Sequence, residues 1–319
     1  MTSTAYPLPP GQERPVPPPS RASTVPFAPP GSNLRCETAY TLWGHLEDPK
    51  HPPLICVHGG PGATSIYMAP HSLIQNDLGI PIITYDQLGC GKSTHLRSKR
   101  GDTSFWNLDL FVAELGNLIK ELGIAKYSLL GNSHGGHVIT AFAATQPKGL
   151  QSMIICNSTA VMSLRAKIAG EQMLALPPPH REAVALARES GDRETPGYKA
   201  AAMVYYHQHL CRVDPWPKEF THSFAALEDD DTVGSSWFDY GEKLDMRPLL
   251  RKLASETVPG GMLVVNSKFD VATDEAMMPY FMEPSTKVKW VKFALGGHML
   301  ILDETEEFNK AIGEFLLMG

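Results

Sequence analysis

Residues 131–136 read Gly-Asn-Ser-His-Gly-Gly, and this short stretch carries most of the information about the fold. The apolar run 127–130 precedes it, and a helical pattern follows it. A G-x-S-x-G motif between a strand and a helix is typical of a sharp turn that exposes a serine side chain at the end of the strand. The flanking glycines are needed because a Cβ atom would clash in so tight a turn. The sequence therefore predicts Ser133 as a nucleophile, with the N-terminus of the next helix directed at the site.

The composition favours a globular enzyme and argues against nucleic-acid or membrane partners. The chain has 319 residues, 43% of them hydrophobic, and it carries a net charge of −6 without a basic block. No apolar run reaches the ~18 residues of a membrane span, and the N-terminus lacks the pattern of a signal peptide. Five cysteines are scattered without the spacing of metal ligands. We expect a cytoplasmic protein that needs no metal or other cofactor.

The first 30 residues contain ten of the 27 prolines, which predicts a loose tail or a surface strap over residues 1–35. From residue 36 on, apolar runs alternate with helical patterns. The predicted strands are 53–57, 80–85, 127–130, 153–156, 262–266 and 287–293, and the clearest helices are 105–122 and 304–318. Apolar strands that alternate with helices indicate a mostly parallel central sheet with helices on both faces.

One long segment interrupts this alternation. Residues 157–247 are mostly helical in pattern, with loops at 177–179 and 228–231. We interpret the segment as a helical cap inserted between two parts of one α/β core, residues 36–156 and 248–319.

A serine nucleophile needs a base, and the base needs a carboxylate that orients it and stabilises its charged form. In hydrolases built on such a sheet, the chain order is serine, then acid, then histidine, with the partners just beyond late strands. Asp270 and His298 meet this requirement, since each follows a late predicted strand by a short loop. Asp274 and Asp303 compete with Asp270, but we expect them on or near helices.

The reaction also needs backbone donors for the oxyanion that forms during acyl transfer. One should be the N–H of His134, the residue after the nucleophile. Residues 58–62 read His-Gly-Gly-Pro-Gly after a predicted strand, and we expect Gly60, with Gly59 as second choice, to provide the other donor. The alternative, that this run is only a tight turn, is disfavoured by its place upstream of the serine motif.

Three other sequence patterns are weaker evidence for a functional site. Residues 89–93 read Gly-Cys-Gly-Lys-Ser, but a phosphate-binding loop requires a glycine at the position of Asp86, which we expect to bind backbone N–H groups near the site. His134 and His137 lie one helical turn apart without a carboxylate at zinc spacing, which favours packing and site lining. The acidic run 228–231 is most simply a solvated loop.

With these residues placed, the chain resembles the proline iminopeptidase-like α/β-hydrolases, serine aminopeptidases and amino-acid amidases with a helical lid. The resemblance covers about residues 36–319. It rests on His-Gly-Gly-Pro-Gly at 58–62, Asp-Gln-Leu-Gly-Cys-Gly-Lys-Ser at 86–93, the serine motif at 131–136, Tyr-Tyr-His-Gln-His-Leu-Cys-Arg at 205–212, Asp270, and Gly-Gly-His-Met at 296–299. It implies the α/β-hydrolase fold and a Ser133–Asp270–His298 catalytic triad.

The chain departs from this family in the cap. Family aminopeptidases hold the substrate's α-ammonium with cap glutamates, and the matching positions here are Ala200 and Trp237. A desolvated ammonium without a carboxylate costs roughly several kcal/mol, whereas a tryptophan offers an apolar wall. We therefore expect Trp237, Phe238 and Tyr205 to bind a small to medium, neutral and apolar amide or ester. The acidic run 228–231 could still supply a carboxylate.

Three alternatives stay open beside this expectation. The first is an aminopeptidase or amino-acid amidase that acts on free N-terminal residues, and so on a small molecule or a short peptide. The second is a tailoring hydrolase of a biosynthetic pathway. The third is a binding protein that reuses the fold without catalysis, which the presence of all three triad candidates disfavours. The oligomeric state does not follow from the sequence.

Overall fold

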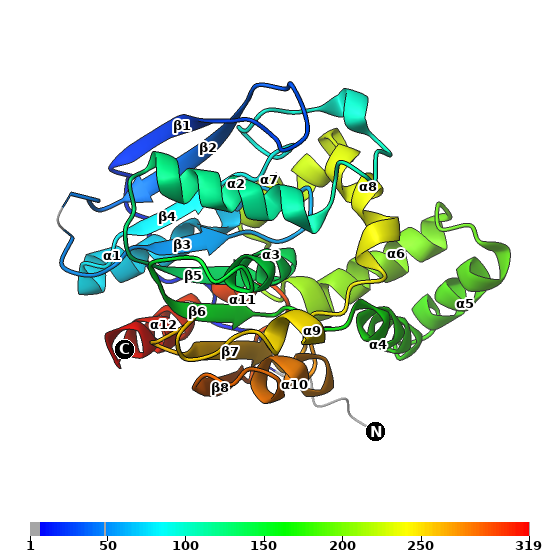
Figure 1. Ribbon diagram of the computed structural model, residues 1–319. Helices are drawn as coiled ribbons and strands as arrows, with labels where there is room; N and C mark the ends of the chain where they lie inside the picture. Colours follow the sequence, from blue (N-terminus) through cyan, green and yellow to red (C-terminus); the bar gives the residue numbers. More distant parts are fainter. Residues whose placement is uncertain (1–6, 48, 319) are drawn as a thin grey trace.

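The computed structural model describes residues 7–47 and 49–318, which form one eight-stranded sheet (Figure 1). The strand order is β1-β2-β4-β3-β5-β6-β7-β8. The pairs β1–β2 and β2–β4 are antiparallel, and the other pairs are parallel. The strands are β1 (Arg21–Phe27), β2 (Cys36–Trp43), β3 (Leu54–Val57), β4 (Ile82–Tyr85), β5 (Tyr127–Asn132), β6 (Leu150–Cys156), β7 (Met262–Ser267) and β8 (Val288–Phe293). The predicted mostly parallel sheet is confirmed.

Helices cover both faces of this sheet. Outside the segment between β6 and β7, they are η1 (Ser65–Ser72), α1 (Leu73–Leu78), η2 (Arg97–Lys99), α2 (Leu108–Glu121), α3 (His134–Ala143), α10 (Asp274–Met282), α11 (Leu300–Asp303) and α12 (Thr305–Met318). In β3, Ile55 and Val57 pack into one hydrophobic cluster, with α2 and α3, whereas Leu54 and Cys56 pack into the other, with α1 and α12. All four side chains are buried because successive residues of a strand face opposite sides. No described helix combines the length and apolarity needed to cross a membrane.

The prediction of a tail or strap over residues 1–35 is wrong for one part of this segment. Residues Arg21–Phe27 form the edge strand β1, which pairs with residues 36–42 of β2. Val25 and Phe27 are buried, while the residues between and before them are exposed. Pro26 obscured this strand in the sequence, but an edge strand tolerates proline because one side of it makes no ladder hydrogen bonds.

The described residues before β1 follow the surface as a strap. The indole Nε1 of Trp43 donates to the Pro17 carbonyl at 2.8 Å, and Gly11 N donates to the Asp303 carbonyl at 2.8 Å. Arg14 adds an exposed ion pair with Asp77 at 2.8 Å. The strap therefore connects the antiparallel edge of the sheet with the loop before α12.

The segment between β6 and β7 is almost entirely helical. It contains α4 (Met162–Leu174), α5 (His180–Ser190), α6 (Pro196–Tyr205), the π-helical turn η3 (Tyr206–Leu210), α7 (Lys218–Asp229), α8 (Thr232–Gly241) and α9 (Arg247–Leu250). Figure 1 shows α4 to α6 projecting to one side of the sheet. The chain leaves and returns at adjacent points, since Val161 and Asp245 form an isolated antiparallel bridge and Met246 N donates to the Ala160 carbonyl at 2.8 Å.

Replacing Phe27 tests whether β1 belongs to the folded core. We expect Phe27→Ala to lower the free energy of unfolding by about 3 kcal/mol, because it removes a buried aromatic side chain. The matched control Thr24→Ala, at an exposed position of the same strand, should change it by less than about 0.5 kcal/mol. Urea denaturation of both variants makes the measurement. Equal, small changes in the two variants would show that the segment does not pack in solution.

Candidate active site

The serine motif forms the sharp turn between β5 and α3. Ser133 precedes the first residue of α3 and has φ 54° and ψ −121°, a strained backbone conformation for a residue with a side chain. A Cβ atom on Gly135 would clash with the Val57 carbonyl, and one on Gly131 would clash with the backbone of Gly135. These contacts explain the glycines of the motif, and they hold the serine at the carboxyl end of the parallel strands.

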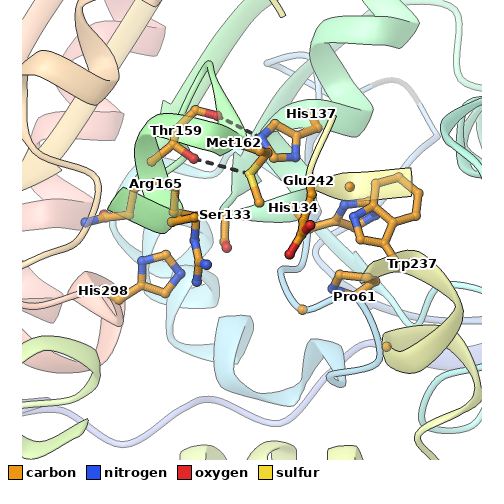
Figure 2. A pocket seen from close by; sticks show the side chains of 15 residues that line it. Pro61, Ser133, His134, His137, Thr159, Met162, Arg165, Trp237, Glu242 and His298 are labelled. Carbon is orange, nitrogen blue, oxygen red and sulfur yellow. Dashed lines mark hydrogen bonds between the residues drawn. The ribbon is translucent and has the colours of Figure 1, made fainter. Parts of the chain in front are cut away.

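Asp270 and His298 lie together, as the sequence predicted. The loop after β7 carries Asp270, which is completely buried, and the loop after β8 carries His298. Nδ1 of His298 and Oδ1 of Asp270 are 2.8 Å apart. His298 and Ser133 line the same cavity (Figure 2). Because the Asp270 carboxylate contacts Nδ1, the other imidazole nitrogen, Nε2, makes no contact with that carboxylate.

Asn157 completes the surroundings of the buried carboxylate. Its Nδ2 donates to Oδ2 of Asp270 at 2.5 Å and to Oγ of Ser267 at 3.1 Å. Asn157 follows β6 directly and has φ 50°, a conformation that asparagine tolerates better than most residues. The two oxygens of Asp270 thus have different partners, which fixes the orientation of the carboxylate relative to His298.

The two competing acids have other partners. Asp274 forms an exposed ion pair with Lys292 at 2.7 Å. Asp303 is buried, which raises the pKa of its carboxyl to about 6, and it accepts hydrogen bonds from the backbone N–H groups of Gly297 at 2.7 Å and Arg212 at 2.8 Å. Asp303 therefore supports the loop that carries the histidine and does not contact the imidazole itself.

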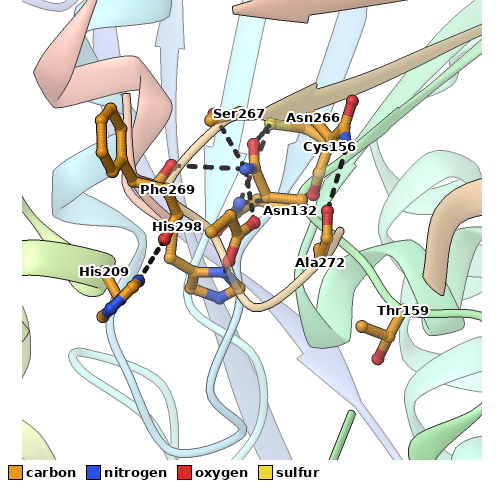
Figure 3. A network of polar contacts seen from close by, with 12 residues as sticks. Asn132, Cys156, Thr159, His209, Asn266, Ser267, Phe269, Ala272 and His298 are labelled. Carbon is orange, nitrogen blue, oxygen red and sulfur yellow. Dashed lines mark hydrogen bonds and ion pairs between the residues drawn. The ribbon is translucent and has the colours of Figure 1, made fainter. Parts of the chain in front are cut away.

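The π-helical turn η3 holds the histidine loop from the other side. The backbone N–H of His298 donates to the carbonyl of His209 at 2.9 Å. The ring of His209 is directed at the carbonyl of Phe269, with Nδ1 and oxygen 2.6 Å apart (Figure 3). A Cβ atom on Gly297 would lie 2.9 Å from the His209 carbonyl, so this approach requires glycine. The inserted helices and the histidine loop are thereby connected through main-chain contacts.

The two glycines predicted as oxyanion donors differ in whether their N–H group already donates a hydrogen bond. The N–H of Gly59 is already used, because it donates to the hydroxyl of Tyr67 at 2.6 Å, and that hydroxyl donates to Oδ1 of Asn132 at 2.7 Å. Gly60 has φ 121° and lines the cavity with His134. Among the described residues, nothing accepts a hydrogen bond from the N–H of Gly60 or His134. The geometry thus favours Gly60 over Gly59.

The cavity beside Ser133 has a volume of about 260 Å³, which suits a small to medium substrate. Its walls come from the glycine turn after β3, the start of α3, the loop after β6, α4, α8 and the histidine loop. Figure 2 shows Trp237 and Pro61 on the side of Ser133 opposite His298. Helices of the inserted segment therefore form part of the wall around the serine.

Trp237 meets the first residue of α3. Its ring centroid lies 4.3 Å from that of His134 in an edge-to-face arrangement, and only 5% of the residue is exposed. Burial holds the pKa of His134 well below its ordinary value, so its imidazole is neutral. Neither ring nitrogen of His134 has a partner in the described part of the chain. The wall contributed by these two side chains is uncharged.

The other predicted cap contacts are not all found at the cavity. Tyr205 does not line it, since its hydroxyl donates to Oε1 of Gln172 at 3.0 Å. Gln172 in turn donates to the Asp270 carbonyl at 3.1 Å, so Tyr205 supports the loop of the buried acid. Ala200 is exposed on α6, away from the cavity. The side chain of Phe238 lies outside the described residues.

The acidic run is only in part the solvated loop that the sequence predicted, since Glu228, Asp229 and Asp231 are exposed and Asp230 is not. Asp230 is buried and lies 2.6 Å from Nδ1 of His95, while Asp229 and Asp231 form exposed ion pairs with Arg97 and Arg100. None of these carboxylates lines the cavity. Local sequence did not show this because the basic partners lie more than 100 positions earlier in the chain.

The expected role of Asp86 is confirmed. Its two carboxylate oxygens accept the backbone N–H groups of Ser65 and Lys92, each at 2.8 Å. A Cβ atom on Gly91 would clash with the Asp86 carboxylate, which explains a glycine in this loop without any phosphate.

Sequence reasoning missed three polar residues of the site. Asn157 could have been found as a polar residue directly after a parallel strand. Arg165 and Glu242 also line the cavity, but Arg165 shares α4 with Lys167 and Glu171, and Glu242 follows α8 directly and precedes Lys243. Nothing in their local sequence separates them from solvent-exposed charges.

Comparisons with known proteins agree with this fold. A family described as the alpha/beta hydrolase fold matches residues 52–305. The proline iminopeptidase of Levilactobacillus brevis is 34% identical over 88% of this chain and 93% of its own length, and that of Heyndrickxia coagulans is 28% identical over 83% and 90%. The crystal structure of VinJ has 30% identity and a TM-score of 0.84 over 94% of this chain and 99% of that one. The proline iminopeptidase of Mycobacterium smegmatis has 32% identity and a TM-score of 0.81 over 93% and 98%.

The chain therefore belongs to the α/β-hydrolases and, among them, to the proline iminopeptidase-like hydrolases.

Buried histidines should make the stability depend on pH. Burial lowers the pKa of His137 and of His71 from 6.5 to about 4. Between about pH 6.5 and 4 the unfolded chain binds protons that the folded protein excludes, so the free energy of unfolding falls as the pH falls through this window. Each histidine contributes up to about 3 kcal/mol to this loss, and nothing above pH 6.5. Urea denaturation at pH 7 and pH 5 measures it.

The variant His137→Gln should lose less stability than the wild type between these two pH values. The control His222→Gln, at an exposed position, should behave like the wild type. The same pH dependence in all three proteins would contradict the assignment of the effect to buried His137.

Proposed function

We propose that the chain is a serine hydrolase that cleaves an amide or ester bond through an acyl-enzyme on Ser133. The observation that carries this proposal is the 2.8 Å contact between His298 and buried Asp270, with the imidazole lining the same cavity as Ser133. A carboxylate on Nδ1 keeps Nε2 unprotonated and able to accept the serine proton.

The reaction would run in two halves. In the first, Oγ of Ser133 attacks the carbonyl carbon while His298 takes the serine proton, and His298 then gives that proton to the leaving nitrogen or oxygen as the bond to carbon breaks. In the second, His298 takes a proton from water, the oxygen of that water attacks the acyl carbon, and the acid leaves as Ser133 regains its proton. The N–H groups of Gly60 and His134 would stabilise the oxyanion in both halves.

The cavity wall supports a neutral, apolar acyl group. Trp237 is uncharged and packs on neutral His134, and the three aspartates of the acidic run are engaged with basic residues elsewhere. Residues 157–247 would act as the cap that excludes water from the acyl-enzyme and selects the substrate. The bridge between Val161 and Asp245 joins the two ends of this segment beside the core.

One observation favours a second candidate, an aminopeptidase or amino-acid amidase that acts on free N-terminal residues. Glu242 lines the cavity and forms no ion pair within the described residues, so its carboxylate could bind a substrate ammonium. The similarity to proline iminopeptidases supports the same reading.

Substitution of the triad candidates tests the mechanism. Ser133→Ala and His298→Ala should each lower kcat by at least about 10⁴-fold, and Ser133→Ala should abolish labelling by a fluorophosphonate probe. Asp270→Asn should lower kcat by about 10⁴-fold, because the imidazole loses the partner that fixes its tautomer. The control Asp274→Asn, at the exposed competing acid, should stay within about threefold of wild type. An active Ser133→Ala protein would refute the proposal.

A panel of substrates with one common acyl skeleton separates the two candidate functions. The skeleton is offered as a free aminoacyl amide, as its N-acetylated form and as a neutral ester. For the neutral-substrate hydrolase we expect at least a roughly tenfold higher kcat/KM on the two neutral forms, since an unpaired ammonium in the cavity is costly. A preference for the free aminoacyl amide that Glu242→Gln removes, and the exposed control Glu228→Gln retains, would establish the aminopeptidase instead.

A further inference from the structure

Arg165 contributes a cation to the cavity that contains Ser133. It belongs to α4, it is half-buried, and it lines the cavity together with Ser133 and His298. Its guanidinium makes neither a hydrogen bond nor an ion pair with any of the described residues. By contrast Lys167, two positions later on the same helix, lies outside the cavity and 3.9 Å from Glu171 at the surface.

An unpaired arginine in such a place is costly unless a ligand satisfies it. The guanidinium presents five N–H donors in a planar fork that matches a carboxylate, and partial burial removes part of the water that would otherwise solvate it. The one described carboxylate side chain in the cavity wall is that of Glu242. Figure 2 shows Glu242 beside Trp237, across the cavity from Arg165. The protein therefore leaves the positive charge of Arg165 to a bound molecule.

The position of Arg165 relative to Ser133 indicates which part of the substrate it would meet. Figure 2 shows Arg165 and His298 on one side of Ser133, and Trp237 and Pro61 on the other. His298 must give its proton to the leaving atom, so the leaving group has to lie on the side of His298. The acyl group then lies toward Trp237 and the backbone N–H groups of the oxyanion site.

We propose that Arg165 binds a carboxylate on the leaving group, and that the substrates are N-acyl amino acids with a free α-carboxylate. This inference rests on the proposed acyl-enzyme function and names its substrate class. The bond between acyl carbon and nitrogen breaks, the nitrogen receives the proton from His298, and the amino acid leaves with its carboxylate still paired to Arg165. The acyl group stays on Ser133 until water releases it as the acid.

Matched substrates that differ only in this carboxylate test the proposal. Each N-acyl amino acid is compared with its C-terminal carboxamide on the wild type, Arg165→Gln and Arg165→Lys. We expect the wild type to prefer the carboxylate form at least about tenfold in kcat/KM, since a charge-assisted contact of this kind is worth roughly 10–100-fold. Arg165→Gln should lose this preference mainly through KM and should keep its activity on the carboxamide within about threefold. Arg165→Lys should retain part of the preference.

The control Lys167→Gln removes a cation from the same helix outside the cavity and should leave the preference unchanged. Equal losses on both substrate forms in Arg165→Gln, or no preference in the wild type, would overturn the proposal.

Binding to Ser133→Ala protein separates this inference from the proposed function. The Kd of each matched pair is measured on Ser133→Ala and on the double variant Ser133→Ala/Arg165→Gln by titration calorimetry. Tighter binding of the carboxylate form that depends on Arg165 supports the inference even if wild-type Ser133 fails to react with a fluorophosphonate, a result that would refute only the acyl-enzyme. Equal Kd values for the two forms would refute the role of Arg165 even where the acyl-enzyme is established.

Discussion

The close approach of α3 to the end of β3 is the constraint on which the rest of the site depends. Gly135 lies against the Val57 carbonyl with no room for a side chain, and Gly131 lies against Gly135 in the same way. These contacts force the strained φ of 54° at Ser133. They also bring the N-terminus of α3 beside the glycine turn after β3, so that His134 and Gly60 line one cavity.

The loop of His298 is supported by parts of the chain that lie far apart in sequence. From the core, the carboxylate of Asp303 accepts a hydrogen bond from the N–H of Gly297. From the inserted helices, the carbonyl of His209 accepts a hydrogen bond from the N–H of His298. One oxygen of the buried Asp270 carboxylate contacts the imidazole, and the hydrogen bond from Asn157 to the other oxygen maintains this orientation. Because main-chain groups provide most of this support, the side chain of His298 stays available to the cavity.

The parts of the fold that follow from local sequence patterns were predictable from the sequence. The strands of the parallel core were recognisable because they are apolar on both faces, and the serine motif was recognisable because only glycine fits its turn. The edge strand β1 was missed because it alternates weakly and contains Pro26. Asp270 and His298 were placed together correctly because parallel strands end at one edge of the sheet. Tyr205 was misplaced because a helical pattern does not show which face meets the cavity.

By itself, the sequence determined the sharp turn at Ser133, the chain order of the three triad candidates and the family to which the chain belongs. Such features depend on steric limits within a few neighbouring residues. The tertiary structure alone decided that Asp303 supports a loop, that the N–H of Gly59 is occupied by Tyr67, and that Arg165 lines the cavity without a partner among the described residues. These outcomes depend on which charged groups and hydrogen-bond donors from distant parts of the chain come close together. The sequence alone does not give the distances between such groups.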